Sequence, residues 1–366
     1  MYALKSILYP RIRFLLTIFG IALCAILMLF LLAIYRGASE GSVRYVRDSK
    51  ADLWILQQHT TNILRSSSLL PISIESKIQK INGIESSDPV FFILSSVKTT
   101  KGPATLYLTG YDIQTGFGGP PHIAEGNPIT ENDQIILDRS FAAKFGIHIG
   151  EEIHIKDDTL RVAGLSSGTN MFVIQYAFIS LQKAHEIVGY PFLVSCFQVR
   201  LKPGSNPSEI IRELQGNIPD IVAFDQKTFL KNNKHEMESG ILPLLYTVAF
   251  IGAIVLTAIL SLILSMHVLE RRNDYAVLKA LGAPAGFLPW LIIKQAVILS
   301  LCGMMAAVVL FFPLMKFVEK ISPEVAGEST VRHIAFVLAG IGIICLVSSV
   351  IPIGKLRKIY PLEVFT

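Results

Sequence analysis

The chain has 366 residues, of which 51% are hydrophobic and 17% are charged, and its formal net charge is +5. Soluble domains carry about 25% charged residues, so this composition, with a mean hydropathy of +0.51, excludes an ordinary soluble protein. The excess of positive charge comes from short segments beside apolar runs, which indicates membrane topology and gives no support to a nucleic-acid-binding surface.

The first apolar run covers residues 14–35 and follows a short segment, residues 1–13, that carries Lys5, Arg11 and Arg13. About 20 apolar residues are enough to cross the hydrocarbon core of a bilayer as a helix. The run is longer than the apolar core of a signal peptide, typically about 7–15 residues, and no clear small-residue cleavage site follows it. We therefore expect an uncleaved transmembrane helix, preceded by a cytoplasmic amphipathic segment.

Residues 36–240 form a polar insert of ordinary domain size, which we expect to be a mixed α/β extracytoplasmic domain ending in a stalk. Stretches rich in β-branched and aromatic residues predict strands, and apolar residues at helical spacing predict short helices. The last polar stretch, from Gln226 to Ser239, fits either a helical stalk or a plain linker. Expected strands are Ala51–Leu56, Val90–Val97, Ala104–Asp112 and Cys196–Gly204; expected helices are Ile72–Gly83 and Pro207–Pro219, the latter with a serine near its N-cap; Gln134–Leu165 should form strand, helix, strand, a turn at Asp157–Asp158 and a strand; Tyr176–Gly189 should form a strand that leads into a helix.

Three more apolar runs follow, at residues 241–266, 287–312 and 334–353. They are separated by residues 267–286 and 313–333 and followed by residues 354–366. Basic residues are concentrated before the first run, between the second and third runs, and after the fourth. Because cytoplasmic loops carry the excess of Lys and Arg, both termini and residues 267–286 are expected in the cytoplasm, with residues 313–333 as an outer loop. The predicted fold class is a membrane α-helical protein with four transmembrane helices plus a mixed α/β extracytoplasmic domain.

The sequence contains no catalytic or metal-binding motif that we can identify. No phosphate-binding lysine loop occurs, and the pairs His185–Glu186 and His235–Glu236 lack the second histidine of a zinc-protease motif. Cys196 is the single cysteine outside the apolar runs, so no disulfide framework is expected. We therefore expect a chain that is not itself an enzyme and binds no metal or cofactor.

The charged phrase ERRNDYAVLKALGA, from Glu270 to Ala283, lies between the second and third apolar runs. Its spacing predicts an amphipathic helix with an apolar stripe of Tyr275, Leu278 and Leu281, which ends at Gly282 and Pro284. Such a helix can lie in the lipid surface, cap the helix bundle, or dock into a groove on a cytoplasmic partner. The residues alone do not separate these uses.

The same phrase, with the membrane run that follows it, resembles the signature of the MacB/FtsX-type permease family of ABC transporters. Three further regions resemble that family in the same order along the chain: ALKSILYPRIRFLLTIFGIAL at the N-terminus, GNPITENDQIILDRSFAAKFGIHIGEEIHI in the insert, and PIGKLRKIYPLEVF at the C-terminus. The resemblance therefore covers essentially the whole chain.

The resemblance implies a non-catalytic permease of the bacterial inner membrane that works with a separate cytoplasmic ABC ATPase, which binds ATP and Mg. It also implies a second permease copy, identical or related, and a periplasmic adaptor (membrane-fusion) protein as a further partner beside the membrane lipids. ATP binding would move the outer domain through the membrane helices. The residues expected to couple the chain to the ATPase are Glu270, Arg271, Asp274, Tyr275, Leu278, Lys279, Leu281 and Gly282.

For such a permease we expect export or extraction of an amphipathic substrate: a peptide, a haem-like compound, a macrolide or a lipid-linked molecule. The alternative is a signalling module of FtsX type that regulates an extracellular hydrolase. Tyr35 and Tyr45 are weak candidates for contact with a haem-like substrate, and the substrate-binding residues are otherwise unknown. A set of aromatic and methionine residues in the insert lines either a hydrophobic site or the domain core: Phe91, Phe92, Phe117, Met171, Phe172, Tyr176 and Phe178.

Overall fold

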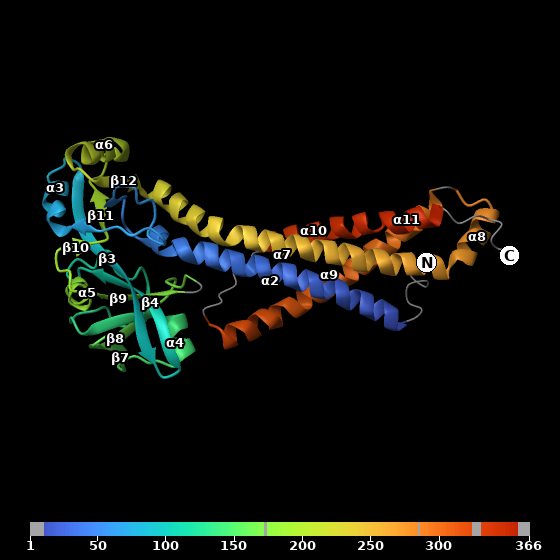
Figure 1. The fold of residues 1–366 in the computed structure, drawn as a ribbon, viewed down its shortest axis with the longest axis horizontal. Helices are drawn as coiled ribbons and strands as arrows, with labels where there is room; N and C mark the ends of the chain where they lie inside the picture. Colours follow the sequence, from blue (N-terminus) through green and yellow to red (C-terminus); the bar gives the residue numbers. More distant parts are fainter. Residues whose placement is uncertain (1–10, 172–173, 285, 324–330, 358–366) are drawn as a thin grey trace. The chain divides into compact units, whose positions relative to one another are not determined.

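The computed structural model describes residues 11–171, 174–284, 286–323 and 331–357. They divide into two compact units (Figure 1). The helical unit contains residues 11–35, 242–317 and 331–357, and the α/β unit contains residues 36–241 with 318–323.

Long helices dominate the helical unit. Among the described residues, four helices are long and apolar enough to cross a membrane, over Leu15–Asp48, Leu242–Glu270, Phe287–Ile321 and Ile334–Arg357. This confirms the prediction of four transmembrane helices beside an α/β domain. The helices are α2 (Arg11–Asp48), α7 (Gln226–Glu270), α8 (Arg272–Ala280), α9 (Phe287–Ile321), α10 (Val331–Ser348) and α11 (Val350–Arg357).

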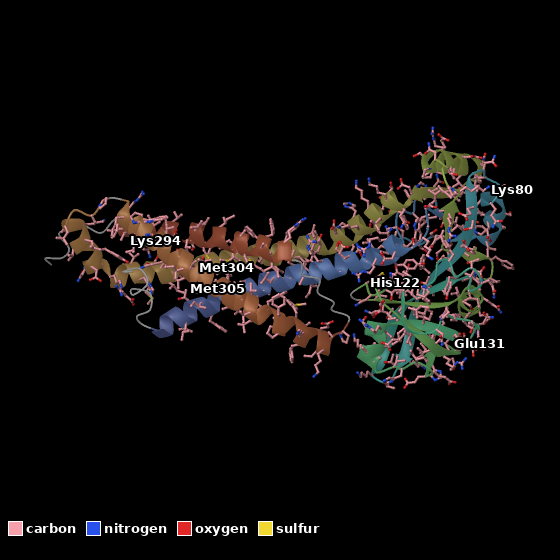
Figure 2. The ribbon with its side chains drawn as sticks, turned by 180° about the vertical axis from the view of Figure 1, so that it is seen from behind. Lys80, His122, Glu131, Lys294, Met304 and Met305 are labelled. Carbon is pink, nitrogen blue, oxygen red and sulfur yellow. The ribbon has the colours of Figure 1, made fainter. Side chains whose placement is uncertain are left out.

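Small and branched apolar side chains form the core of this bundle. Ile21 of α2 lies so close to Gly303 of α9 that a β-carbon at Gly303 would come within 2.5 Å of it, which shows why a residue without a side chain stands there. Large apolar side chains such as Phe250 and Met305 are 68% and 62% exposed, as expected of surfaces that face lipid. Lys294 extends from α9 (Figure 2). Its ammonium lies 5.5 Å from the centroid of the Trp290 ring, close enough for a cation–π interaction.

The structural helices extend beyond the apolar runs that predicted them. Helix α2 continues to Asp48, and α7 begins at Gln226, so the stretch expected to be a stalk or a linker is helical. Helix α9 passes through Pro313, where we expected a loop to begin, and ends at Ile321. Membrane helices tolerate an internal proline because neighbouring groups can satisfy the freed carbonyl. Residues 1–10, 324–330 and 358–366 of the predicted terminal segments and loop lie outside the described residues.

A mixed sheet of ten strands forms the framework of the α/β unit, with short helices packed on it (Figure 1). The strand order is β12-β1-β11-β3-β4-β9-β6-β8-β5, and β7 pairs with β3 and β8. The strands are β1 (Leu53–Gln57), β3 (Ile84–Thr99), β4 (Gly102–Tyr111), β5 (Ile123–Gly126), β6 (Gln134–Asp138), β7 (Glu152–Ile155), β8 (Asp158–Ser166), β9 (Gln175–Ser180), β11 (Cys196–Leu201) and β12 (Ile221–Asp225), with β2 (Leu70–Pro71) and β10 (Leu193–Val194) as a separate pair. The short helices are α3 (Glu75–Ile78), α4 (Arg139–Phe145), α5 (Leu181–Val188) and α6 (Pro207–Asn217).

Strand β3 joins two halves of this sheet. Its first residues pair with β11 from Ile84↔Leu201 to Val90↔Cys196, and the residues from Val90 onward pair with β4. Each half has its own apolar core, one between the sheet and α3 and α6, the other between the sheet and α4 and α5. One long strand therefore belongs to both halves of the sheet.

Most expected elements of the insert are present, and three details differ. The helix expected over residues 72–83 is a single turn, α3, after a 3-10 turn at Ile72–Ile74. The β7–β8 turn begins one residue earlier than expected, with Lys156 at a φ of 54°. Helix α6 is capped by Asn206, whose side-chain oxygen accepts a hydrogen bond from the Ser208 amide, so Ser208 is not the cap.

The beginning of α7 is anchored in the α/β unit by buried side chains. Trp54 of β1 stacks on Phe229 with ring centroids 4.7 Å apart, and its indole nitrogen donates to the Gln226 side chain at 3.3 Å. Gln226 also donates to the Val46 carbonyl of α2 at 2.9 Å. Asn233 is fully buried, accepts from the Ile63 amide at 3.0 Å and donates to the Phe229 carbonyl at 2.8 Å. The start of α7 and the end of α2 are therefore held by the same core.

Replacing Asn233 with alanine is expected to destabilise the α/β unit by about 2 kcal/mol, because the buried Ile63 amide then has no acceptor. The measurement is the free energy of unfolding of the full chain, followed by tryptophan fluorescence since Trp54 lies in the same core. The matched control is Asn232→Ala at the preceding, half-buried position, which should change stability by less than about 0.5 kcal/mol. Equal losses in both variants would contradict the anchoring role of Asn233.

Candidate functional site

The predicted coupling segment is a short helix, α8, that follows α7 after a single residue. Arg271 separates the two helices and pairs with Asp274 across 3.9 Å, an ion pair in which the Asp274 side chain is half exposed. Because exposed pairs contribute about 0–1 kcal/mol, this pair helps to orient the junction more than it stabilises the fold. The helix is shorter than the expected Glu270–Ala283, and Gly282, at a φ of 84°, ends it as predicted.

One face of α8 packs against the other helices of the bundle. Tyr275 and Ala276 are each 1% exposed and share an apolar cluster with Val268, Leu288, Leu291, Ile292 and Leu356, against which Leu278 is partly buried. Lys279 donates to the Leu356 carbonyl at 3.0 Å, at the end of α11, where a cation is also favoured by the helix dipole. Among the expected coupling residues, Tyr275, Leu278 and Lys279 therefore attach α8 to the bundle.

The opposite face of α8 carries apolar side chains that are exposed. Leu281 is 78% exposed and Val277, four residues earlier and so on the same face, is 41% exposed. Glu270 and Asp274 are also exposed. We define Val277 and Leu281 as the exposed face of α8. The sequence analysis missed Val277, and the spacing i, i+4 from Leu281 was the signal that could have found it.

A second candidate site is an apolar pocket of about 600 Å³ within the α/β unit. Its wall includes Phe92 and Tyr107, whose rings stack with centroids 5.4 Å apart. The Tyr107 hydroxyl donates to the Ile63 carbonyl, and burial raises the pKa of Tyr107, so the phenol remains protonated. Leu94 is 60% exposed and Arg65, which pairs with Glu236 at 3.5 Å, supplies a charge on the lining. The other apolar lining side chains include Leu69, Met171, Ile174 and Met237.

Some of the aromatic and methionine residues singled out in the sequence line the pocket, and others lie in the core. Phe92 and Met171 line the pocket, although Met171 is only 8% exposed. Phe172 lies outside the described residues. Of the remaining residues of the set, Phe91 is buried in the core beside α4 and α5, and Phe117, Tyr176 and Phe178 are buried in a further apolar cluster that contains Trp54.

The structure places Tyr45 in the core of the α/β unit and Tyr35 half-buried on α2. The Tyr45 hydroxyl donates to the Gly118 carbonyl at 2.7 Å and accepts from Gln198 at 3.1 Å. Its ring packs against Trp54, Phe92, Tyr176 and Phe178. Tyr45 serves the core, and we do not assign it to a substrate.

Comparisons with known proteins match both units. The family model of the MacB-like periplasmic core domain matches residues 14–217, and the model of the FtsX-like permease C-terminal region matches residues 246–361. A protein of Staphylococcus epidermidis named as a candidate hemin transport system permease, HrtB, is 21% identical over 99% of this chain and 97% of its own length. An uncharacterized ABC transporter permease of Mycobacterium tuberculosis is 20% identical over 99% of this chain and 98% of its own length. Among solved structures, the periplasmic region of MacB from Actinobacillus actinomycetemcomitans is similar at 15% identity, covering 51% of this chain and 94% of that one, with a TM-score of 0.40.

Proposed function

Because this chain belongs to the MacB/FtsX-type family of ABC transporter permeases, we propose that it is the non-catalytic membrane subunit through which a separate ATPase drives movement of the α/β unit. In this proposal the ATPase binds ATP and Mg in the cytoplasm and docks on the exposed face of α8, Val277 and Leu281. The cargo is an amphipathic molecule that is exported or extracted from the outer side of the bacterial inner membrane.

The continuity of α7 is the observation that carries this proposal. Helix α7 is a single helix of 45 residues that begins among the buried anchors of the α/β unit and ends one residue before α8. At about 1.5 Å per residue it is roughly 68 Å long, enough to cross a membrane and extend well beyond it. We therefore propose that a displacement of α8 is transmitted along α7, since no loop interrupts this helix.

The charge distribution supports the proposed orientation. Arg271, Arg272 and Lys279 flank or belong to α8, and Lys355 and Arg357 lie at the end of α11. With these groups in the cytoplasm, as the excess of basic residues predicts, both termini are cytoplasmic and the α/β unit is extracytoplasmic.

A groove on the helical unit supports a second permease copy as a partner. The groove measures about 630 Å³ and is formed by α7 with Ile351 and Lys355 of α11. Small side chains of α7 line it, including Ala253, Ala258 and Ser261, and small residues at such a surface let another helix approach closely. The second copy would be identical or a related permease, and a periplasmic adaptor is a further expected partner.

The apolar pocket supports an amphipathic cargo over the signalling alternative. An apolar wall with one charged residue on its lining suits a ligand with an apolar body and a polar group. The name of the staphylococcal relative points to hemin, which is such a molecule. A peptide, a macrolide or a lipid-linked molecule has the same amphipathic character, whereas regulation of a hydrolase requires no pocket of this kind.

Cargo dependence of ATP turnover tests the proposal. In lipid nanodiscs that contain the chain and its ATPase, amphiphiles that fit the pocket are expected to raise ATP turnover several-fold. Leu94→Arg, which places a charge in the pocket, should abolish that increase and leave basal turnover unchanged. The control is Ile149→Arg, a side chain of the same unit that is 43% exposed away from the pocket. Stimulation that survives Leu94→Arg would contradict the pocket as the cargo site, and binding of a secreted hydrolase without any amphiphile response would favour signalling.

A further inference from the structure

The α/β unit contains a second, larger cleft whose lining is acidic. The cleft measures about 1540 Å³ and lies beside α3, the first half of β3, the end of β4 and α5. Six carboxylate side chains line it, and no lysine or arginine does among the described residues. The six are Glu75, Glu85, Asp88, Asp112, Glu131 and Glu186.

Four of these six carboxylates have no cationic partner among the described residues. Glu131 is paired with Arg161 at 2.9 Å and Glu186 with Lys183 at 2.6 Å, so their charges are compensated within the fold. Glu75 is instead close to two of the other carboxylates: burial first, and then the charges of Asp88 and Asp112, raise the pKa of Glu75 above its ordinary value. The fold therefore brings like charges together without compensating them.

Asp88 is the residue that marks the cleft as a binding site. Its side chain is only 5% exposed, yet it has no hydrogen-bond or ion-pair partner among the described residues, and it lines the cleft. Because Asp88 lines the cleft and no group of the described fold pairs with it, its negative charge is available to a ligand there. A ligand that donates hydrogen bonds and carries positive charge would complete this site.

The floor of the cleft indicates what kind of cation fits. Strand β3 pairs with β4 only from Val90 onward, so the segment from Ile84 to Pro89 has β11 on one side and no strand on the other among the described residues. A strand edge of this kind can pair with an extended peptide through its backbone groups. The described residues contain no cluster of three acidic, histidine or cysteine side chains arranged to hold a metal ion, which favours an organic cation.

Exposed aromatic side chains lie next to this cleft in the chain. Tyr190 is 60% exposed and Phe192 is 74% exposed, and both adjoin Pro191, which lines the cleft. Exposed aromatic groups beside a polar cleft are typical of protein-binding surfaces.

We propose that the cleft binds an extended, positively charged segment of a polypeptide, whose Lys or Arg side chains reach Asp88 and Glu75 and whose backbone pairs with the free edge of β3. The site requires no contribution from an ATPase.

Peptide binding to the full chain in nanodiscs of zwitterionic lipid tests this site. The probe is a fluorescent peptide of alternating Lys and Thr, followed by anisotropy, with alternating Glu and Thr as the control peptide. The basic peptide should bind with an affinity that falls as salt is raised, and the acidic peptide should not bind. The double variant Glu75→Gln, Asp88→Asn should weaken binding at least tenfold.

The matched control removes the same number of charges elsewhere on the α/β unit. Glu209 and Glu213 are exposed on α6 and do not line the cleft, so Glu209→Gln with Glu213→Gln should change affinity less than twofold. Glu85 is an exposed residue of the lining, so Glu85→Lys should weaken binding at least tenfold without changing a buried side chain. Thermal unfolding of each variant verifies that it is folded.

Two results would overturn the proposal. If the cleft variants and the α6 variants weaken peptide binding equally, the net charge of the unit explains the binding and the cleft does not. If spermidine displaces the peptide at the same concentration of positive charge, the cleft is a site for small cations and the peptide does not pair with β3. Slower amide exchange of the residues between Ile84 and Pro89 in the presence of the peptide is the expected sign of that pairing.

Discussion

Leu281→Asp is expected to reduce ATP-driven activity of the assembled transporter at least tenfold, while the protein remains folded and inserted in the membrane. Leu281 is 78% exposed at the end of α8 and contributes little to the apolar cluster beneath that helix. An exposed leucine on an amphipathic helix is the type of anchor that a partner groove buries, and burial of such a side chain contributes about 2 kcal/mol. A carboxylate in its place has to be desolvated, so docking should be lost.

The measurements are co-purification of the ATPase with the chain and cargo-stimulated ATP turnover in nanodiscs. Leu281→Met is the matched control, because it keeps an apolar side chain of similar volume and should retain activity. Val277→Asp, on the same face, should reproduce the loss. If the ATPase still co-purifies with both aspartate variants at the wild-type ratio, the exposed face of α8 is not its docking surface.

Leu278→Asp is expected to behave differently from Leu281→Asp. Leu278 packs against the cluster that contains Tyr275, Val268 and Leu356, so a carboxylate there loosens α8 from the bundle. We expect a lower unfolding temperature as well as lost coupling. The two substitutions therefore separate a contact made with a partner from a contact made inside the chain, although both leucines belong to the stripe that the sequence shows.

The long apolar runs and the alternating strands could be predicted because they depend on local pattern. A run of about 20 apolar residues has few alternatives to a membrane helix, and stretches such as Val90–Val97 are rich in strand-forming residues. The ends of helices depend on tertiary context, which explains why α7 begins at Gln226. Its first turns are polar, and the stacking of Phe229 on Trp54 and the burial of Asn233 fix them.

The candidate site was predicted only in part for a related reason. The periodicity of Glu270–Ala283 identifies an amphipathic helix, but it cannot tell which apolar residues pack on the bundle and which remain exposed. That division depends on the position of Leu288, Leu291 and Leu356, which are distant in the sequence. The acidic cleft gave no sequence signal, because the pairing of β3 with β4 brings Asp88 and Asp112 together, and the packing of α3 on β3 adds Glu75.

Weakening α7 between its anchors and its apolar part should uncouple the two units without disturbing either. His235 and Ser239 are exposed on this part of α7, one turn apart and next to Gly240. Glycine at both positions costs the helix about 2 kcal/mol relative to alanine, so the helix here should bend or unwind more often. We expect cargo-linked activity to fall about tenfold while the ATPase still binds.

The matched control is the pair His235→Ala and Ser239→Ala, which removes the same side chains and strengthens the helix. It should retain activity, whereas the glycine pair should not, and the two variants have the same chain length and the same buried contacts at Asn233 and Phe229. Spin labels on either side of Gly240 should report a broader distance distribution for the glycine pair alone. If both pairs support full activity, the rigidity of this part of α7 is not what transmits the movement.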